Sequence, residues 1–159
     1  MSEPPRADDT DVAALDRLLD ELHAAAARSD GPAYFELFTE DAVFIGTDVR
    51  ERWSLAQFRA RSEPIFADGR GWFYAKRDRR IIVGPPHCGV AWFDEVLDSR
   101  DYGTSRGTGV LLRTVRGWKV AQYALAHPIP NDVGKEVLAR IQAFEASRIP
   151  VSQNAGSGR

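Results

Sequence analysis

The sequence predicts an α+β fold in which helices cover one face of a strongly bent antiparallel sheet. Between residues 89 and 126, three runs rich in Val, Leu, Trp, Phe and Tyr are separated by two turn signals. The runs cover residues 90–97, 107–115 and 118–125. Strand-forming runs with short breaks that contain Gly or Asp are typical of consecutive antiparallel hairpins. Helical patterns stand before and after this meander, and helices segregated to one face of an antiparallel sheet define the α+β class.

The first two helices are predicted by periodicity and by a proline. Residues 11–28 carry an apolar stripe at helical spacing, which consists of Val12, Leu15, Leu19, Leu22 and Ala26. Pro32 follows Asp30 and Gly31 and favours the first turn of a second, short helix. The packing residues expected for that helix are Tyr34, Phe35, Leu37 and Phe38.

Two further helices follow in the sequence. Ser54 and Gln57 have the spacing of a capping box, and Trp53 with Phe58 fits a hydrophobic staple, so a helix is predicted from residue 55 towards 66. Pro64 predicts a kink or a break near residue 61. A last helix begins at residue 131 or 132 and has an apolar face made of Val133, Val137, Ile141 and Phe144.

The remaining strands and the chain ends complete the expected layout. Residues 43–45 predict a short strand, and residues 72–83 a long strand that is bulged at 77–80, where alternation fails. We expect one domain over residues 11–148, with disordered tails at 1–10 and 149–159. A bent sheet with helices across its concave side forms a cone with an open mouth, which is a natural small-molecule site.

Composition excludes several classes of function. The chain has 159 residues and a net charge of -2, so it does not favour nucleic acid or an anionic membrane. Cys88 is the single cysteine, which rules out an intrachain disulfide. The start of the chain lacks the pattern of a signal peptide, and no apolar run approaches the ~20 residues of a membrane span. The expected location is the cytoplasm.

Several motifs, in order along the chain, resemble those of one family. They are Phe44-Ile-Gly-Thr-Asp48, Arg52-Trp53, Gly71-Trp-Phe-Tyr74, Ala91-Trp-Phe-Asp-Glu95, Arg106-Gly-Thr-Gly109 and Trp118-Lys-Val-Ala-Gln-Tyr123. Over residues 15–144 the chain resembles the SnoaL-like proteins of the nuclear transport factor 2 (NTF2-like) superfamily. The resemblance implies the cone fold, but that scaffold carries isomerases, cyclases, dehydratases, hydrolases and binding proteins alike. Relatives often carry His and Ser after the Gln-Tyr pair, where this chain has Ala124 and Ala126.

The candidate catalytic residue is one of two adjacent carboxylates. Two sets of side chains alternate along the first meander strand: Trp92, Asp94 and Val96 on one face, and Phe93, Glu95 and Leu97 on the other. We expect Asp94 to face the helices, because Trp92 beside it could line a pocket, whereas a bulge between residues 72 and 83 would turn Glu95 inward instead. A carboxylate in an apolar pocket can act as a general base. The structural alternative is an ion pair with Arg106 or Arg113.

The candidate substrate-binding residues are a glutamine and four aromatic residues. Gln122 shares a strand face with Trp118 and Val120 and is predicted to offer a neutral hydrogen-bonding group at the base of the pocket. The predicted pocket walls are Trp53, Trp72, Tyr74 and Trp92, and the alternative for each of them is ordinary core packing.

Other residues with possible chemistry have plainer interpretations. His23, His87 and His127 lack metal-ligand spacing, so neither a metal nor another cofactor is expected. Gly107 and Gly109 precede a strand rather than a helix, which favours close backbone approach or a bulge over phosphate binding.

Three functions remain open from the sequence. The first is a ligand-binding domain for a small, mostly apolar metabolite, and the second is a cofactor-independent lyase or isomerase that transfers protons through Asp94 and Gln122. The third is a dimerisation or protein-interaction module. Both faces of the meander carry apolar residues, with Val110 and Leu112 opposite in phase to Leu111. We therefore also expect a homodimer through the uncovered sheet face.

Overall fold

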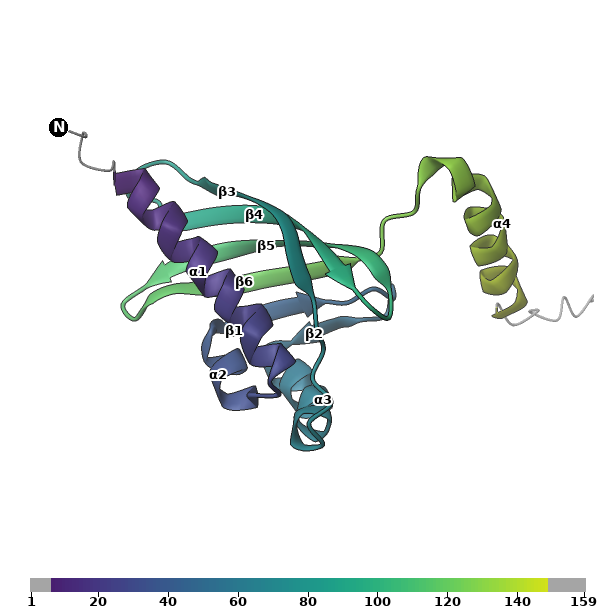
Figure 1. Ribbon diagram of the computed structural model, residues 1–159, viewed down its shortest axis with the longest axis horizontal. Coiled ribbons are helices and arrows are strands. Elements are labelled where there is room, and N and C mark those ends of the chain that lie inside the picture. Colours follow the sequence, from purple (N-terminus) through teal and green to yellow (C-terminus); the bar gives the residue numbers. More distant parts are fainter. Residues whose placement is uncertain (1–6, 149–159) are drawn as a thin grey trace, which may run out of the picture. The chain divides into compact units, whose positions relative to one another are not determined.

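A curved, unclosed sheet is the centre of the fold (Figure 1). The computed structural model describes residues 7–148, and within them the strand order is β2-β1-β6-β5-β4-β3. The strands are β1 (Phe38–Ile45), β2 (Arg52–Ser54), β3 (Ala75–Val83), β4 (Val90–Ser99), β5 (Gly103–Thr114) and β6 (Gly117–Ala126). Neighbours are antiparallel except β1 and β6, which pair in parallel. The predicted meander is confirmed as β4-β5-β6.

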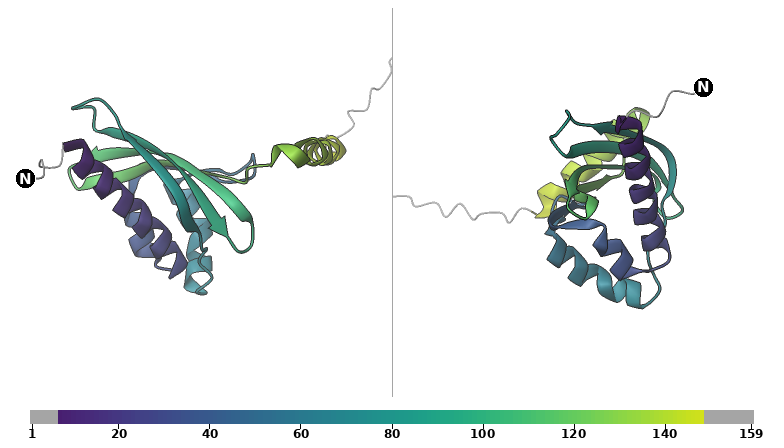
Figure 2. Two further views of the ribbon diagram at one scale, coloured as in Figure 1. Left: turned by 45° about the horizontal axis from the view of Figure 1, so that its top comes forward. Right: turned by 90° about the vertical axis from the view of Figure 1, so that its left-hand side faces the viewer.

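Three helices cover one face of this sheet. They are α1 (Ala7–Ala27), α2 (Gly31–Glu36) and α3 (Leu55–Ala67). Figure 2 shows all of them on the same side of the curved sheet, with α1 crossing the strands. The core lies between the helices and the sheet, where Leu15, Leu19 and Leu22 of α1 are buried against Leu111 and Val120. The predicted α+β architecture, with helices across the concave face, is confirmed.

Local sequence signals account for the helix starts. The Asp30 side chain accepts a hydrogen bond from the Ala33 backbone N–H, and Pro32 lies in the first turn of α2. At α3 the capping box is complete, because Ser54 and Gln57 each bond the other's backbone N–H. The staple is also present, since the Trp53 and Phe58 rings stack with centroids 6.0 Å apart.

Two bulges shift the phase of side chains in the sheet. In β3 the pairing with β4 slips between Lys76 and Asp78, which confirms the bulge predicted at residues 77–80. In β6 the pairing with β5 slips too: Val110 pairs with Gln122, but Leu111 pairs with Val120. Ala121 is the extra residue, and every side chain beyond it changes face.

Some boundaries differ from the predicted ones. β1 begins at Phe38, because Phe38 pairs with Val120 of β6, and the short strand β2 was not predicted. β3 begins at Ala75, and Trp72 to Tyr74 lie in a connection without regular secondary structure. α3 continues without a break to Ala67, although Pro64 lies inside it. The expected tails fall on residues outside the described range, apart from the residues from Ala7 onward, which begin α1.

Among the described residues, 7–127 form one compact unit and 128–148 belong to another. In the second unit, α4 (Asn131–Arg148) has no buried side chain within the described range, and its predicted apolar face is largely exposed. None of the described helices is both long and apolar enough to cross a membrane.

Candidate functional site

Glu95 is a buried acid on the concave face of the sheet. It lies on β4 between Phe93 and Leu97, whose side chains share its face and are also buried. Its exposed fraction is 1%. A buried carboxylate is costly unless charged or hydrogen-bonding partners surround it, so those partners define the site.

Partners from three elements surround the Glu95 carboxylate. The Tyr123 hydroxyl of β6 donates a hydrogen bond to Oε1 over 2.7 Å, and His23 Nε2 of α1 lies 2.8 Å from the same oxygen. Arg79 of β3 donates from Nε to Oε2 over 2.8 Å. Its Nη2 lies 2.7 Å from Oε2 as an ion-pair contact, without the alignment of a hydrogen bond. Glu95 therefore joins α1 to β3 and β6, two strands that lie on either side of β4 in the sheet.

These contacts keep Glu95 ionised. Burial by itself raises the pKa of this carboxyl, but the hydrogen bond with His23, then the charge of Arg79 and the hydrogen bond from Tyr123, outweigh burial and hold the pKa below its usual value. The pKa of Tyr123 is raised well above its ordinary value by burial and by the Glu95 charge, so Tyr123 stays a neutral donor. An ionised Glu95 is an acceptor only, which places a proton on His23 Nε2.

The second ring nitrogen of His23 is available for other chemistry. No hydrogen bond joins Nδ1 to any residue of the described part of the chain. A neutral imidazole that donates from Nε2 carries a lone pair on Nδ1. A histidine whose tautomer is fixed by a buried carboxylate has the arrangement of a general base with its orienting acid.

His23 and Tyr123 line a small interior cavity. The cavity has a volume of about 20 Å³, which is room for about one water molecule. Its walls are Leu22, His23, Tyr34, Phe44, Trp72, Tyr74, Tyr123 and Leu125. The predicted cone-shaped pocket is therefore nearly filled by aromatic side chains. Trp72 and Tyr74 come from the irregular connection before β3, so the wall they form is not part of a helix or strand.

A glycine makes room for the polar cluster. A Cβ added at Gly107 of β5 would lie 2.2 Å from the Tyr123 hydroxyl and 2.9 Å from Glu95 Oε1. Gly107 is therefore needed for close approach, as the sequence indicated, because any side chain there would occupy the space of the hydrogen bond between Tyr123 and Glu95.

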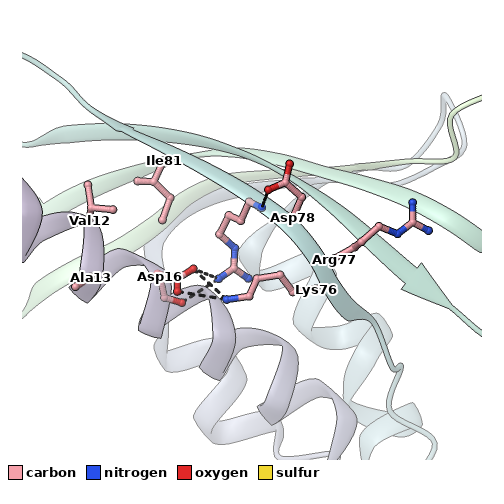
Figure 3. Close-up of a pocket in the computed structure, with 8 residues that line it drawn as sticks. Val12, Ala13, Asp16, Lys76, Arg77, Asp78 and Ile81 are labelled. Carbon is pink, nitrogen blue, oxygen red and sulfur yellow. Dashed lines mark hydrogen bonds and ion pairs between the residues drawn. The ribbon is translucent and has the colours of Figure 1, made fainter.

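A larger groove of about 500 Å³ lies between α1 and β3 (Figure 3). Figure 3 shows Lys76 directed at Asp16, whereas Arg77 extends away from them. Lys76 pairs with Asp16 and Asp20, and Arg77 pairs with Asp98 on β4. Each lysine or arginine that lines this groove is paired with a carboxylate, which is the state expected of a structural network.

The expected inward position of Asp94 is wrong. Asp94 is exposed, and Trp92 on the same strand face is 43% exposed, so this face is the outer one. The prediction took Trp92 as a mark of the inner face, but the inner face of β4 carries Phe93 and Glu95. The alternative that placed Glu95 inward is confirmed, and its arginine partner is Arg79 rather than Arg106 or Arg113. Asp94 and Trp92 cannot reach the cavity.

Gln122 is also displaced from its predicted face. It pairs with Val110 and Val43 on the outer side of the sheet. The cause is the bulge at Ala121, because Val120 before it and Tyr123 after it both point into the core. The polar group that the pocket receives from β6 is therefore the hydroxyl of Tyr123.

Two of the four aromatic residues predicted as pocket walls line the cavity, and two do not. Trp72 and Tyr74 line the cavity as expected. Trp53 instead stacks on Phe44 and Phe58 at the edge of the core, and Arg61 covers its ring. Sequence reasoning missed His23 and Tyr123 as site residues, although His23 follows Leu22 at the border of the buried stripe of α1.

No group of His, Cys, Asp and Glu residues suited to a metal ion occurs in residues 7–148. Cys88 is exposed. Within the described range, the Glu95 cluster is the place where buried titratable groups meet a cavity.

Comparison with known proteins identifies the family. Residues 15–130 match the SnoaL-like domain. The chain belongs to this family, within the NTF2-like superfamily. No protein of curated function matches the sequence.

Solved structures share the fold at low identity. A proposed dehydratase of the NTF2-like family from Streptomyces avermitilis has a TM-score of 0.65 at 16% identity, covering 77% of this chain and 99% of its own. A proposed aromatic ring hydroxylase from Novosphingobium aromaticivorans has a TM-score of 0.65 at 20% identity, and the match covers 79% of this chain and 94% of the hydroxylase. A proposed scytalone dehydratase from the same organism has a TM-score of 0.63 at 12% identity, and the match covers 76% of this chain and 85% of the dehydratase. At these identities the likeness shows the fold alone.

Proposed function

We propose that this SnoaL-like protein catalyses cofactor-independent proton transfer on a small, mostly apolar molecule, as a lyase or isomerase does. His23 is the proposed general base, acting through Nδ1. Glu95 holds the imidazole in the tautomer that leaves Nδ1 free, and Tyr123 holds Glu95. The observation that carries the proposal is that His23 both lines the cavity and bonds the buried carboxylate.

The chemistry of the lining supports an uncharged substrate. Both oxygens of Glu95 are engaged by His23, Tyr123 and Arg79, so no full charge is left to bind an ionic group. The remaining walls are aromatic and aliphatic, which suits a planar molecule with a carbonyl or hydroxyl group. The dehydratase named among the structural neighbours is compatible with this class, but it supports the proposal only through the shared fold.

Substrate binding requires the cavity to widen. At about 20 Å³ it holds no organic molecule. The proposed opening is a movement of residues 70–74, which carry Trp72 and Tyr74 and lie outside helices and strands. Such a loop movement would close again over a bound substrate and exclude water.

The test measures proton exchange directly. A set of small ketones and aldehydes is incubated with the protein in D₂O, and loss of the proton next to the carbonyl is followed by ¹H NMR. Wild type should accelerate exchange of at least one compound, and His23→Gln should lose about 10²–10⁴-fold of that acceleration. His87→Gln is the matched control, because His87 is exposed in the connection between β3 and β4 and lies outside the cavity. Equal rates in wild type and His23→Gln would exclude His23 as the base.

Ligand binding without catalysis is the second candidate. It is favoured by the closed, aromatic cavity, which would hold an apolar ligand tightly once formed around it. Native mass spectrometry of the purified protein separates the two functions. A retained small molecule together with no exchange of any compound would support binding alone.

A further inference from the structure

Arg79 connects the two elements that carry the His23–Glu95 pair. Its Nε donates to Glu95 on β4, while its Nη1 contacts α1 at three points. Nη1 donates to the Asp16 main-chain oxygen over 3.0 Å, to Asp16 Oδ1 over 2.6 Å and to Asp20 Oδ1 over 2.8 Å. Asp16, Asp20 and His23 are spaced by four and three residues and so share one face of α1. A single guanidinium thus ties the helix of His23 to the strand of Glu95.

The bulge in β3 makes this connection possible. Lys76 and Arg79 are three positions apart, and a regular strand would place them on opposite faces. The register shift between Lys76 and Asp78 adds one residue, so both cations reach the same acids. Lys76 Nζ lies 3.2 Å from Asp16 Oδ1 and 3.1 Å from Asp20 Oδ2. Arg79 is also the direct cross-strand partner of Glu95.

The connection is buried at Arg79 and open at the acids of α1. The Arg79 side chain is 2% exposed, whereas those of Asp16 and Asp20 are 41% and 49% exposed. A guanidinium offers five donors in a fixed planar fork, whereas a lysine ammonium is a compact point charge without that fixed geometry. Arg79 is the partner that holds Glu95 Oε2, while His23 and Tyr123 hold Oε1.

We propose that Arg79 is a positioning residue for the proton transfer proposed above. It holds α1 and Glu95 at the separation at which the Nε2–H of His23 donates its hydrogen bond to Glu95. The inference rests on the proposed function for its purpose, but its geometry can be tested separately. The charged or titratable groups that face Glu95 are His23 from α1, Arg79 from β3 and Tyr123 from β6. Removing Arg79 leaves Glu95 with its two partners on Oε1 and with Oε2 unpaired.

The test reads the tautomer of His23 by NMR in the full chain labelled with ¹⁵N-histidine and ¹³C-carboxyl glutamate. The variants are Arg79→Gln, Arg79→Lys and Arg80→Gln. Arg80 is the matched control, because it is exposed and pairs with Asp78 rather than Glu95. Wild type and Arg80→Gln should show the neutral form of His23 as a single Nε2–H tautomer. Arg79→Gln should populate both tautomers, and the Glu95 carboxyl carbon should titrate at a higher pH than in wild type.

The lysine variant separates charge from geometry. Arg79→Lys keeps a positive charge but not the fork, so the Glu95 titration should stay close to wild type while the His23 tautomers become mixed. A wild-type tautomer in both Arg79 variants would overturn the positioning role. If Arg79→Gln fails to fold by circular dichroism, the double variant Asp16→Asn, Asp20→Asn loosens the same connection from the exposed side. An unchanged single tautomer in that variant would also overturn the role.

Proton exchange distinguishes this inference from the proposed function. Where wild type exchanges a substrate proton, Arg79→Gln should slow it at least tenfold, and Arg80→Gln should not. Exchange at the wild-type rate in Arg79→Gln would contradict positioning and leave the function standing. If the His23 tautomer depends on Arg79 but wild type exchanges no substrate proton, the positioning role of Arg79 is retained and the proposed proton-transfer function is excluded.

Discussion

Gly107 is the residue where packing and the polar cluster can be tested together. In Gly107→Ala, the new methyl group would lie 2.2 Å from the Tyr123 hydroxyl, so Tyr123 must move away from Glu95. The expected loss is about 1–3 kcal/mol for the broken buried hydrogen bond, with about 1–3 kcal/mol more for overpacking. Urea denaturation should show a lower midpoint for this variant.

The control for this prediction is Gly134→Ala. Gly134 lies in α4 with no atom within 4 Å of an added Cβ, and alanine is the better helix former by about 1 kcal/mol. Its midpoint should equal or exceed that of wild type. A Gly107→Ala midpoint equal to wild type would mean that Tyr123 does not approach Glu95 as the structure has it.

The site could be predicted only in part, because its residues are joined by long-range contacts. The alternation of side chains along the strand narrowed the inward-facing acid to Asp94 or Glu95. The choice of Asp94 was wrong, because a tryptophan on a half-exposed strand does not mark the inner face. His23 and Glu95 are 72 positions apart, and their contact depends on how α1 crosses the sheet. No local sequence pattern indicates where α1 crosses the sheet. The need for close approach at Gly107 was visible, since a glycine inside a strand has few other uses.

At the scale of elements, the junction between β2 and α3 offers a test of packing. Trp53 stacks on Phe44 and Phe58, whose centroids are 6.2 Å and 6.0 Å from it, and it lies outside the cavity. Trp53→Ala should therefore cost stability rather than ligand affinity, near the lower end of the about 3–5 kcal/mol typical of Trp truncation because the ring is only partly buried. Denaturant midpoints measure the effect.

Phe73→Ala is the comparison for Trp53→Ala. Phe73 is an aromatic residue of the same unit with an exposed fraction of 56%, so its truncation should change the free energy of unfolding by less than about 0.5 kcal/mol. A Trp53 variant as stable as the Phe73 variant would show that the staple contributes no packing energy.

Elements with local signals were predictable and those set by pairing were not. The capping box at Ser54 and the proline of α2 fix helix starts through atoms within four residues, and both are present as predicted. β1 and β2 depend on partners elsewhere, since β1 lies beside β6 in parallel. The bulge at Ala121 has no signal in its own residues, and it moved Gln122 out of the predicted site. The bulge in β3 was visible because charged residues interrupt its alternation.

At the scale of the whole molecule, the outer face of the sheet has the properties of an interface. Paired positions place Ile82, Trp92, Val110, Gln122 and Val43 in one row across the strands. Ile82 and Trp92 are 52% and 43% exposed, although both are large apolar residues. The six strands have between 3 and 12 residues each. At about 3.3 Å per residue and about 4.8 Å between strands, their outer face covers an area near the roughly 800 Å² that each partner buries in a standard interface.

We therefore predict a homodimer through this face, with the same row of residues contributed by each copy. Light scattering at micromolar concentration should give twice the chain mass of 17.7 kDa. Trp92→Asp places a charge at the centre of the row and should give the single-chain mass with an unchanged circular dichroism spectrum. Phe73→Asp is the control, because Phe73 is also an exposed aromatic residue, at 56% against 43% for Trp92, but lies in the connection before β3. A single-chain mass for wild type would contradict the prediction, and so would loss of the dimer in both variants, since the outer face would then have no special part in association.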